Sequence, residues 1–310
     1  MRIVLSRKGF DASSGGVASP ILPDGRLVSL PIPARDAPVP YRDVRVNGEA
    51  LGPLVEELSR GRVRAGDRAH LDPDLDRAAL PRLPGWRAAF GQLGAAQAHL
   101  AARGVGPGDL FLFFGWFREV ERARGGLRPR RGAPDLHVLF GWLAVGEVLH
   151  VGEGAGAIVA RRPWLASHPH AHLGRATGNT IYVAADLLPG PGGPRDGLPG
   201  AGLFRTVSEA LVLTQDGQPR RSVWRLPPGF EPRSGGATLS YHADAGRWTR
   251  DGDGAVLRTV GRGQEFVLDC ARRPEAIRWA LGLVRHARAA RPPRRHATAA
   301  SAVASATPPT

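Results

Sequence analysis

The sequence predicts an α+β protein built on a mixed, mostly antiparallel sheet with several helices packed around it. Two apolar runs, residues 109–117 and 137–149, are rich in aromatic and β-branched residues, which indicates strands buried on both faces. Each run is too short to cross a membrane, which takes about 20 apolar residues. A Gln-Asp-Gly-Gln-Pro turn between short apolar segments indicates a hairpin over 211–226.

The length and composition limit the class of protein to which the chain can belong. The chain has 310 residues, 42% of them hydrophobic, which is enough for a substantial core. We expect one domain over 1–290, followed by an Arg/Pro/Ala-rich tail, 291–310, that has no core to bury and is disordered. A single cysteine, Cys270, excludes an internal disulfide and a thiolate-rich zinc site. The N-terminus turns polar after three apolar residues, so we expect no signal peptide and a cytoplasmic location.

Charge points to a polyanionic partner. The formal net charge is +14, and Lys8 is the only lysine among the basic residues. Arginine is a forked donor that suits phosphate, so the partner we expect is nucleic acid or a nucleotide, and not a membrane. An alternative stays open, because the arginine-rich composition of a GC-rich genome would give the same excess whatever the function.

The first element is a strand over 2–5, which leads into a polar loop that ends at Gly16. Glycines in such a loop let backbone N–H groups approach an anion, so a phosphate-binding loop is one reading. The alternative is a solvated turn with an ion pair between Lys8 and Asp11. The polar residues of the loop that we single out are Ser6, Arg7, Lys8, Asp11, Ser13 and Ser14.

Prolines confine residues 19–46 to edge strands and loops, and a short helix is expected over 51–60. His70, Asp72 and Asp74 then alternate with apolar or cyclic residues, which in an extended segment points all three to one side. They could bind a divalent cation, or supply a general base and its orienting partner. The alternative is an Asp-Pro turn in which one aspartate caps the next turn.

Residues 86–103 have the periodicity of a helix with Trp86 and Phe90 on its apolar stripe. Glycines at 91 and 94 each cost about 1 kcal/mol inside a helix, so another backbone or a ligand is expected to approach closely there. Gln92 would contact such a ligand.

The two central runs each contain Phe-Gly-Trp, and a glycine inside a strand suggests a bulge or a close backbone approach. The connection between them, 118–134, holds six arginines and two glutamates. We expect a mobile basic flap, which either contacts phosphate or is a solvated surface loop.

Three histidines at 168, 170 and 172 also alternate. A transition-metal site, the entrance of a ligand pocket and a solvated loop all remain open, since the run contains no carboxylate. A strand is expected over 179–184, where Asn179 is a further candidate ligand contact. A Pro/Gly loop over 187–202, strands within 256–269 and a helix over 275–290 complete the chain.

Several of these motifs together resemble a nucleotide modification associated domain family, over residues 1 to about 285. Such domains are inferred from neighbourhood with base-modification and restriction systems. The resemblance therefore implies a protein that acts on or binds a base, with possible protein partners in a modification system, and it brings no established reaction. The motifs are Ser6 to Asp11 with Gly15-Gly16, Ser19 to Ile21, His70 to Asp74, Phe90 to Gln97, Phe113 to Phe117 and Phe140 to Trp142.

A weaker resemblance links residues 108–149 to PUA-like barrels, some of which read modified bases. It implies an aromatic-lined cavity in which Trp116 and Trp142, with Phe114 and Phe140, could stack on a base. The alternative is that these aromatic residues form the core of the barrel.

Two functional hypotheses follow. In the first, the protein is an enzyme that modifies a nucleotide or base: Ser6, Arg7 and Lys8 hold phosphate, Asp11 or the His70, Asp72 and Asp74 set supplies acid–base or metal chemistry, and Gln92 orients the substrate. In the second, it is a non-catalytic, PUA-like reader of modified bases. The sequence identifies no cofactor, and we assign no metal ligand from it.

Overall fold

The computed structural model describes residues 1–151, 155–173, 176–190, 193–227, 229–232, 238–252, 254–261 and 263–289. The expected tail, 291–310, lies outside the described residues, and the assignment of 1–290 to one domain stays a prediction. Among the described helices, none is long and apolar enough to span a membrane. The α-helices are α1 (Leu51–Ser59), α2 (Gly94–Ala102), α3 (Ala155–Arg161) and α4 (Pro274–Ala289).

Short 3₁₀ turns connect many of the strands. They are η1 (Tyr41–Asp43), η2 (Arg77–Ala79), η3 (Pro163–Ser167), η4 (Pro169–Ala171), η5 (Glu209–Leu211) and η6 (Ala245–Arg247).

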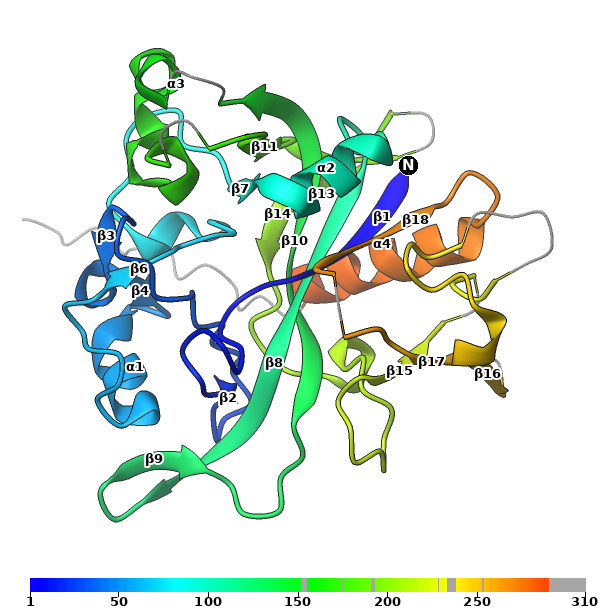
Figure 1. Ribbon diagram of the computed structural model, residues 1–310, viewed down its shortest axis with the longest axis horizontal. Coiled ribbons are helices and arrows are strands. Elements are labelled where there is room, and N and C mark those ends of the chain that lie inside the picture. The colour runs from blue at the N-terminus through cyan, green and yellow to red at the C-terminus, as the bar shows by residue number, and fades with distance from the viewer. Residues whose placement is uncertain are drawn as a thin grey trace, which may run out of the picture.

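A nine-stranded sheet organises the molecule (Figure 1). Its main path runs β18 (Glu265–Asp269), β1 (Arg2–Arg7), β8 (Leu110–Ala123), β10 (Leu136–His150), β11 (Thr180–Ala184) and β7 (Ala89–Gln92). Off this path, β14 (Ala201–Leu203) pairs with β10, while β2 (Ser19–Ile21) and β9 (Gly126–Pro129) pair with β8. Only the β1–β8 and β2–β8 pairs are parallel, so the expected mixed, mostly antiparallel sheet is confirmed.

Smaller sheets flank it. They are β12 (Leu187–Gly190) with β13 (Gly193–Pro199), β15 (Val223–Leu226) with β17 (Gly254–Arg258) and β16 (Trp248–Asp251), β3 (Val39–Pro40) with β6 (Arg68–Ala69), and β4 (Arg45–Val46) with β5 (Glu49–Ala50).

The large sheet is open, so its described strands do not form the closed barrel that the PUA-like resemblance implies. Its two edge strands, β7 and β18, are nevertheless bridged by side chains. The Gln92 amide of β7 donates a hydrogen bond to Glu265 Oε1 of β18 at 2.7 Å. The sheet therefore curls until its edges come within side-chain reach of each other.

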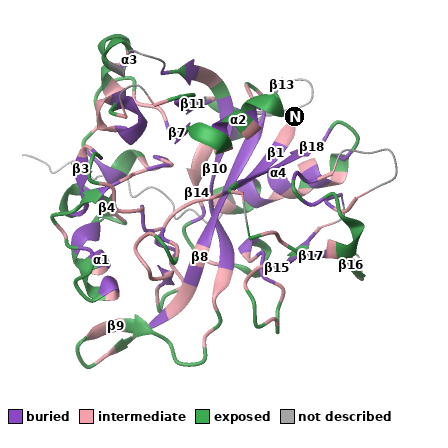
Figure 2. Cartoon of the chain, viewed as in Figure 1, coloured by how far each residue is buried: buried purple, intermediate pink, exposed green. Residues whose placement is uncertain are grey.

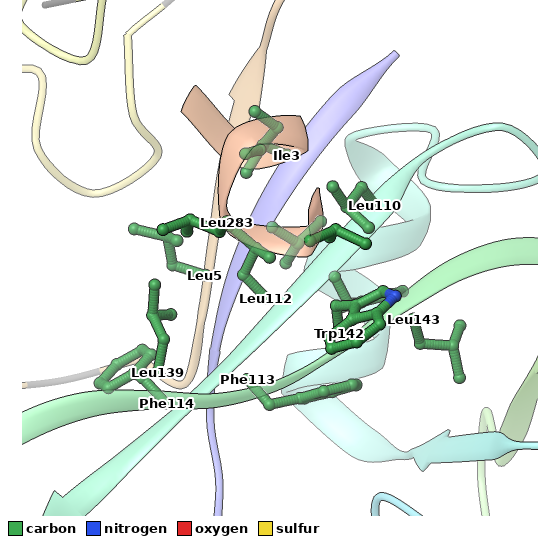
Figure 3. Close-up of a cluster of buried hydrophobic side chains, with 14 of the residues drawn as sticks. Ile3, Leu5, Leu110, Leu112, Phe113, Phe114, Leu139, Trp142, Leu143 and Leu283 are labelled. Carbon is green, nitrogen blue, oxygen red and sulfur yellow. The ribbon is translucent and has the colours of Figure 1, made fainter. Parts of the chain in front are cut away.

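Alternating residues of β8 fill two sides of the sheet. Phe111 and Phe113 pack with Phe90 and Tyr182, with ring centroids 5.0 to 5.9 Å apart, and all four side chains are buried. On the opposite side, Leu112 lies beneath α4 (Figure 3).

Two further groups of buried side chains lie outside this core. One lies around α1 and the strands of the N-terminal region, and the other lies beneath α3, against β7, β10 and β11. Figure 2 shows the purple, buried stretch along β8 and β10, with α1 and α3 both to its left.

Several expected elements are confirmed, among them α1, β11, β17, β18, α4 and the burial of Trp224 in β15. The expectation for the Phe-Gly-Trp glycines is confirmed as well. The register of β10 shifts between Leu139 and Gly141, and a Cβ on Gly115 would lie 2.8 Å from the Lys8 carbonyl oxygen.

The expected helix over 86–103 is wrong in its first half. Ala89–Gln92 forms strand β7, which pairs with β11 and is buried throughout. Gly94, with φ of 61°, makes the turn from this strand into α2, a backbone conformation that favours glycine. Pairing with β11 outweighed the helical periodicity of the segment.

The connection 118–134 contains a hairpin where we expected an irregular flap, and contact with phosphate stays a prediction. Strand β8 continues to Ala123 and pairs with β9, and two of the six arginines pair with the glutamates of β8. Arg128 lies 2.8 Å from Glu121, and Arg130 lies 2.7 Å from Glu119. The expected loop over 187–202 likewise contains the paired strands β12 and β13.

Burial of His137 predicts a pH dependence of stability. Its Nδ1 accepts a hydrogen bond from Trp224 Nε1 at 2.9 Å, and burial, with nearby Arg221 and Arg7, lowers the pKa of His137 to about 3. The unfolded chain therefore binds a proton on this residue between about pH 6.5 and 3 that the folded chain does not. His137 thus stabilises the fold fully above pH 6.5, and this contribution is lost as the pH falls towards 3.

His137→Asn keeps an acceptor near the Nδ1 position but does not titrate. We therefore expect its unfolding free energy to fall less steeply between pH 6.5 and 3 than that of the wild type, by up to about 1.4 kcal/mol per pH unit. Urea unfolding at a series of pH values measures the slope. The exposed His172→Asn is the control, and equal slopes in the two variants would contradict the assignment.

Candidate functional site

The candidate site is built on the free edge of β7. Residues 72–74 lie along that edge, where Asp74 and Ala89 exchange backbone hydrogen bonds of 2.9 and 3.0 Å. The Gly91 N–H donates to Asp72 Oδ1 at 2.7 Å. The strand edge therefore fixes the position of a carboxylate that is only 9% exposed.

Three histidines surround this carboxylate. His168 Nε2 lies 3.5 Å from Asp72 Oδ1, while His170 Nε2 and His70 Nε2 lie 3.7 and 3.9 Å from Asp72 Oδ2. We call His70, Asp72, His168 and His170 the His–Asp cluster. Sequence positions about 100 residues apart thus meet at one point, since η4 brings the histidines of its segment onto β7.

Gly91 makes this approach possible. A Cβ at position 91 would lie 2.2 Å from the ring of His170, a separation that no side chain can adopt. The close approach that we expected at this glycine is therefore to a histidine ring, which neither alternative named.

Hydrogen bonds fix the imidazole tautomers. Asn179 Nδ2 donates to the His170 carbonyl at 2.8 Å, which leaves Asn179 Oδ1 as the acceptor of His170 Nδ1–H at 2.7 Å. His168 Nδ1 accepts from the His170 backbone N–H at 3.3 Å, so His168 carries its hydrogen on Nε2, towards Asp72. In neutral His170, Nε2 holds a lone pair.

The electrostatics keep Asp72 ionised beside the neutral rings of His70 and His170. Burial alone would raise the pKa of Asp72, but the hydrogen bond from His168 and the adjacent imidazoles outweigh it and hold that pKa well below its usual range. Burial lowers the pKa of His170 to about 4 and also lowers the pKa of His70. At neutral pH the Asp72 carboxylate therefore faces the uncharged imidazoles of His70 and His170.

Asp74 takes no part in the cluster. Arg82 holds its two oxygens in a bidentate pair at 2.7 and 2.6 Å and lies 4.4 Å above the ring of Trp86. This ion pair is buried and closes the turn after residue 74. His70, Asp72 and Asp74 were expected on one side, and the structure separates the third from the first two.

A second polar group bridges β7 and β18 beside the cluster. Glu265 Oε1 accepts from Lys8 Nζ at 2.9 Å and from Gln92 Nε2 at 2.7 Å. Glu265 is 1% exposed, and its Oε2 has no hydrogen-bond partner among the described residues. The pKa of His70, lowered mainly by burial, is lowered further by the charge of Lys8, so the two groups are close neighbours.

An exposed aromatic ring lies on the β18 side of this group. Tyr241 is 49% exposed and stacks on His99 with ring centroids 4.5 Å apart. His99 in turn contacts Ser240 Oγ at 3.0 Å, and the carboxylate of Glu265 is near enough to act on the pKa of His99, which burial lowers.

The structure does not bring the remaining loop residues to the cluster. Asp11 Oδ1 accepts from the backbone N–H groups of Ser13 and Ser14 at 2.8 and 2.7 Å, so these three residues form a local turn. Ser6 is fully buried in β1, and the Arg7 backbone pairs with Gln264. Lys8 pairs with Glu265, not with Asp11.

The two tryptophans lie apart. Trp142 is 4% exposed, packs on Phe204 and donates to the Pro199 carbonyl. Trp116 donates to Asp135 and has Arg221 4.5 Å above its ring. Trp142 pairs with Leu112, four positions from Trp116 on β8, so about 13 Å of strand separates them.

Two hollows lie in the surface, and the smaller one reaches the cluster at Asp72 without touching its histidines. This cavity of about 80 Å³ is lined by residues 71–76 together with Val28 and Phe140. It is far smaller than the ~300 to 1,000 Å³ of ordinary ligand pockets. A larger hollow of about 400 Å³ lies over β2 and the β8–β9 hairpin. His70 and Lys8 are the part-exposed residues of the two polar groups.

Glu265, His168 and His170 were absent from our predicted site residues. The alternating histidines were visible in the sequence but had no carboxylate nearby, because Asp72 lies about 100 positions earlier. Glu265 gave no signal, since its partners Lys8 and Gln92 are 257 and 173 positions away.

Comparison with known proteins gives one match. A family model described as Nucleotide modification associated domain 3 matches residues 2–269. No curated protein matches the chain, and no solved structure matches it. The matched range contains every residue of the His–Asp cluster and of the Lys8, Gln92 and Glu265 group.

Gly91→Ala tests the construction of the site. The added methyl group must displace His170, and overpacking of this kind costs about 1 to 3 kcal/mol. Urea unfolding measures the loss, and the His170 imidazole signals in NMR spectra should shift. The matched control is Gly156→Ala in α3, where an added Cβ meets nothing within 4 Å. Unchanged stability and unchanged His170 signals in Gly91→Ala would show that the ring is not packed on this glycine.

Proposed function

The chain belongs to the nucleotide modification associated domain 3 family, and from this membership and the buried site we propose that it is an enzyme that modifies a base. The base is carried by a nucleotide or a nucleic acid. The reaction takes place at the His–Asp cluster, and the group of Lys8, Gln92 and Glu265 beside it holds the substrate.

The observation that carries the proposal is the free-energy cost of burying the His–Asp cluster beside the group of Lys8, Gln92 and Glu265. Two adjacent polar groups are buried together, and among the described residues Glu265 Oε2 has no hydrogen-bond partner. An unsatisfied buried polar atom costs about 1 to 3 kcal/mol, so folding alone does not favour it. Clusters with strongly shifted pKa values and unpaired groups are typical of catalytic sites.

The substrate side suits a base with a phosphate. Lys8 keeps donor hydrogens beyond the one given to Glu265, and the unpaired Glu265 oxygen is an acceptor for an exocyclic amine. The exposed ring of Tyr241 offers a stacking surface worth about 1 to 3 kcal/mol per base. The net charge of +14 favours a polyanion.

Proton transfer is the chemistry within reach of the cluster. When no cation occupies the cluster, the lone pair of His170 Nε2 and the part-exposed His70 can act as general bases, and Asp72 stabilises either imidazole once it is protonated. Such a pair can activate a water molecule or an amine of the substrate.

The alternative is a non-catalytic reader of modified bases that holds its ligand through the same residues. We place either activity in the cytoplasm, together with protein partners of a modification system. A reader binds without changing its ligand, so chemical analysis of nucleosides separates the two hypotheses.

Mass spectrometry of nucleosides provides the test. DNA, RNA and free nucleotides are isolated from cells that express the wild type, Glu265→Gln or Glu121→Gln, and are digested and compared. Glu265→Gln removes the buried charge while keeping its shape. Glu121→Gln removes a surface carboxylate of the β8–β9 hairpin that pairs with Arg128.

We expect a nucleoside whose amount changes in the wild type and in Glu121→Gln, and returns to background in Glu265→Gln with the protein still folded. Identical profiles in all three would contradict an enzyme. If the wild type then bound modified-base DNA in a salt-dependent manner and Tyr241→Ala did not bind it, the reader hypothesis would replace the enzyme hypothesis.

A further inference from the structure

We propose that His70, Asp72 and His170 bind one divalent transition-metal ion through His70 Nε2, Asp72 Oδ2 and His170 Nε2. This inference does not rest on the proposed function, because the binding of a bare ion is measured without any substrate.

Distances between the three donor atoms support a common centre. Asp72 Oδ2 lies 3.7 Å from His170 Nε2 and 3.9 Å from His70 Nε2, and ligand atoms of the three residues lie within 4.8 Å of one another. Two ligands about 2.0 to 2.2 Å from a tetrahedral ion are about 3.4 Å apart. The two His–Asp separations exceed this value by about 0.3 and 0.5 Å, and the two imidazole nitrogens, at most 4.8 Å apart, need to approach each other by up to about 1.4 Å.

The tautomer of His170 leaves its Nε2 as an acceptor, which suits a cation and not a hydrogen bond to Asp72. Asn179 fixes the hydrogen of the neutral ring on Nδ1, so Nε2 directs a lone pair towards Asp72 Oδ2. Two electron pairs then face each other inside the protein. A positive ion between them turns this repulsion into two bonds.

The contacts of Asp72 likewise leave one of its oxygens for the ion. Its Oδ1 is occupied by the Gly91 N–H at 2.7 Å and faces the Nε2–H of His168 at 3.5 Å. The other oxygen, Oδ2, is left to face His70 and His170. Gly91, His168 and Asn179 are thus the outer contacts that hold ligands in place around metal ions.

No arginine or lysine within the described residues forms an ion pair with Asp72, whose partners are the three histidines. The nearest basic side chains are engaged elsewhere: Arg82 pairs with Asp74, and Lys8 pairs with Glu265 at 2.9 Å. The Glu265 carboxylate compensates the charge of Lys8, which reduces its repulsion of a cation beside His70.

The donor set defines the class of ion. Two imidazole nitrogens and one carboxylate oxygen suit Zn²⁺, Fe²⁺ and neighbouring divalent ions of the first row, whereas Ca²⁺ and Mg²⁺ prefer oxygen alone. Three protein ligands leave at least one coordination position for water or substrate, as in catalytic sites. His70, the part-exposed ligand, lies on the side from which a substrate would arrive.

The experiment uses the full chain stripped of metal with a chelator. Zn²⁺ is titrated by calorimetry, Co²⁺ is titrated by its visible absorption, and Fe²⁺ is titrated without oxygen. The variants are His70→Ala, Asp72→Asn and Asn179→Ala. The matched control is His172→Ala, which removes an exposed histidine of the same run.

We expect the wild type and His172→Ala to bind one ion per chain with equal affinity. His70→Ala should lose that site while circular dichroism shows an unchanged fold, and Asp72→Asn should lose it as well. Asn179→Ala should bind about 10 to 100-fold more weakly. His70→Ala decides the matter if Asp72→Asn fails to fold, because His70 is the least buried ligand. Failure of the wild type to bind any of the three ions, or wild-type affinity in His70→Ala, would overturn the proposal.

Discussion

The hydrogen bond from the Gly91 N–H to Asp72 is the interaction on which the site depends. It joins the free edge of β7 to the segment that carries His70 and Asp72, and it places a carboxylate where burial would otherwise disfavour a charge. The absence of a side chain at Gly91 also admits the ring of His170. One residue without a Cβ thus allows two distant segments of the chain to meet, and a larger residue would separate them.

The curl of the sheet gives this edge its surroundings. Because β7 and β18 stand at opposite ends of the strand order, their approach brings Gln92 to Glu265 and leaves Lys8 above the buried ring of Phe90 at 4.5 Å. The aromatic core holds the two edges at a fixed separation. Lys8, Gln92 and Glu265 are therefore positioned by packing, which is the condition for an oriented catalytic or metal-binding group.

The sequence allowed the mixed sheet, the central pair of strands and the His70 and Asp72 candidates to be predicted, because alternation and apolar runs are local signals. Two predictions were wrong. Residues 89–92 form a strand paired with β11 and not the first half of a helix, and 118–134 contains a hairpin in which two arginines pair with glutamates of β8. His168, His170 and Glu265 could not be predicted as site residues from the sequence, because their partners lie about 100 to 260 positions away. Only the curl of the sheet brings them together. Asp11, Ser13 and Ser14 looked like a phosphate loop, although the Asp11 side chain accepts hydrogen bonds from the other two.

The central claim is that Asp72 and two imidazoles form a metal centre at the edge of β7. Anomalous diffraction from crystals of the zinc-loaded protein, recorded on both sides of the zinc absorption edge, tests it most directly. The account predicts one strong anomalous peak among His70 Nε2, Asp72 Oδ2 and His170 Nε2. A peak at His172 or at another surface histidine, with none inside the cluster, would contradict it.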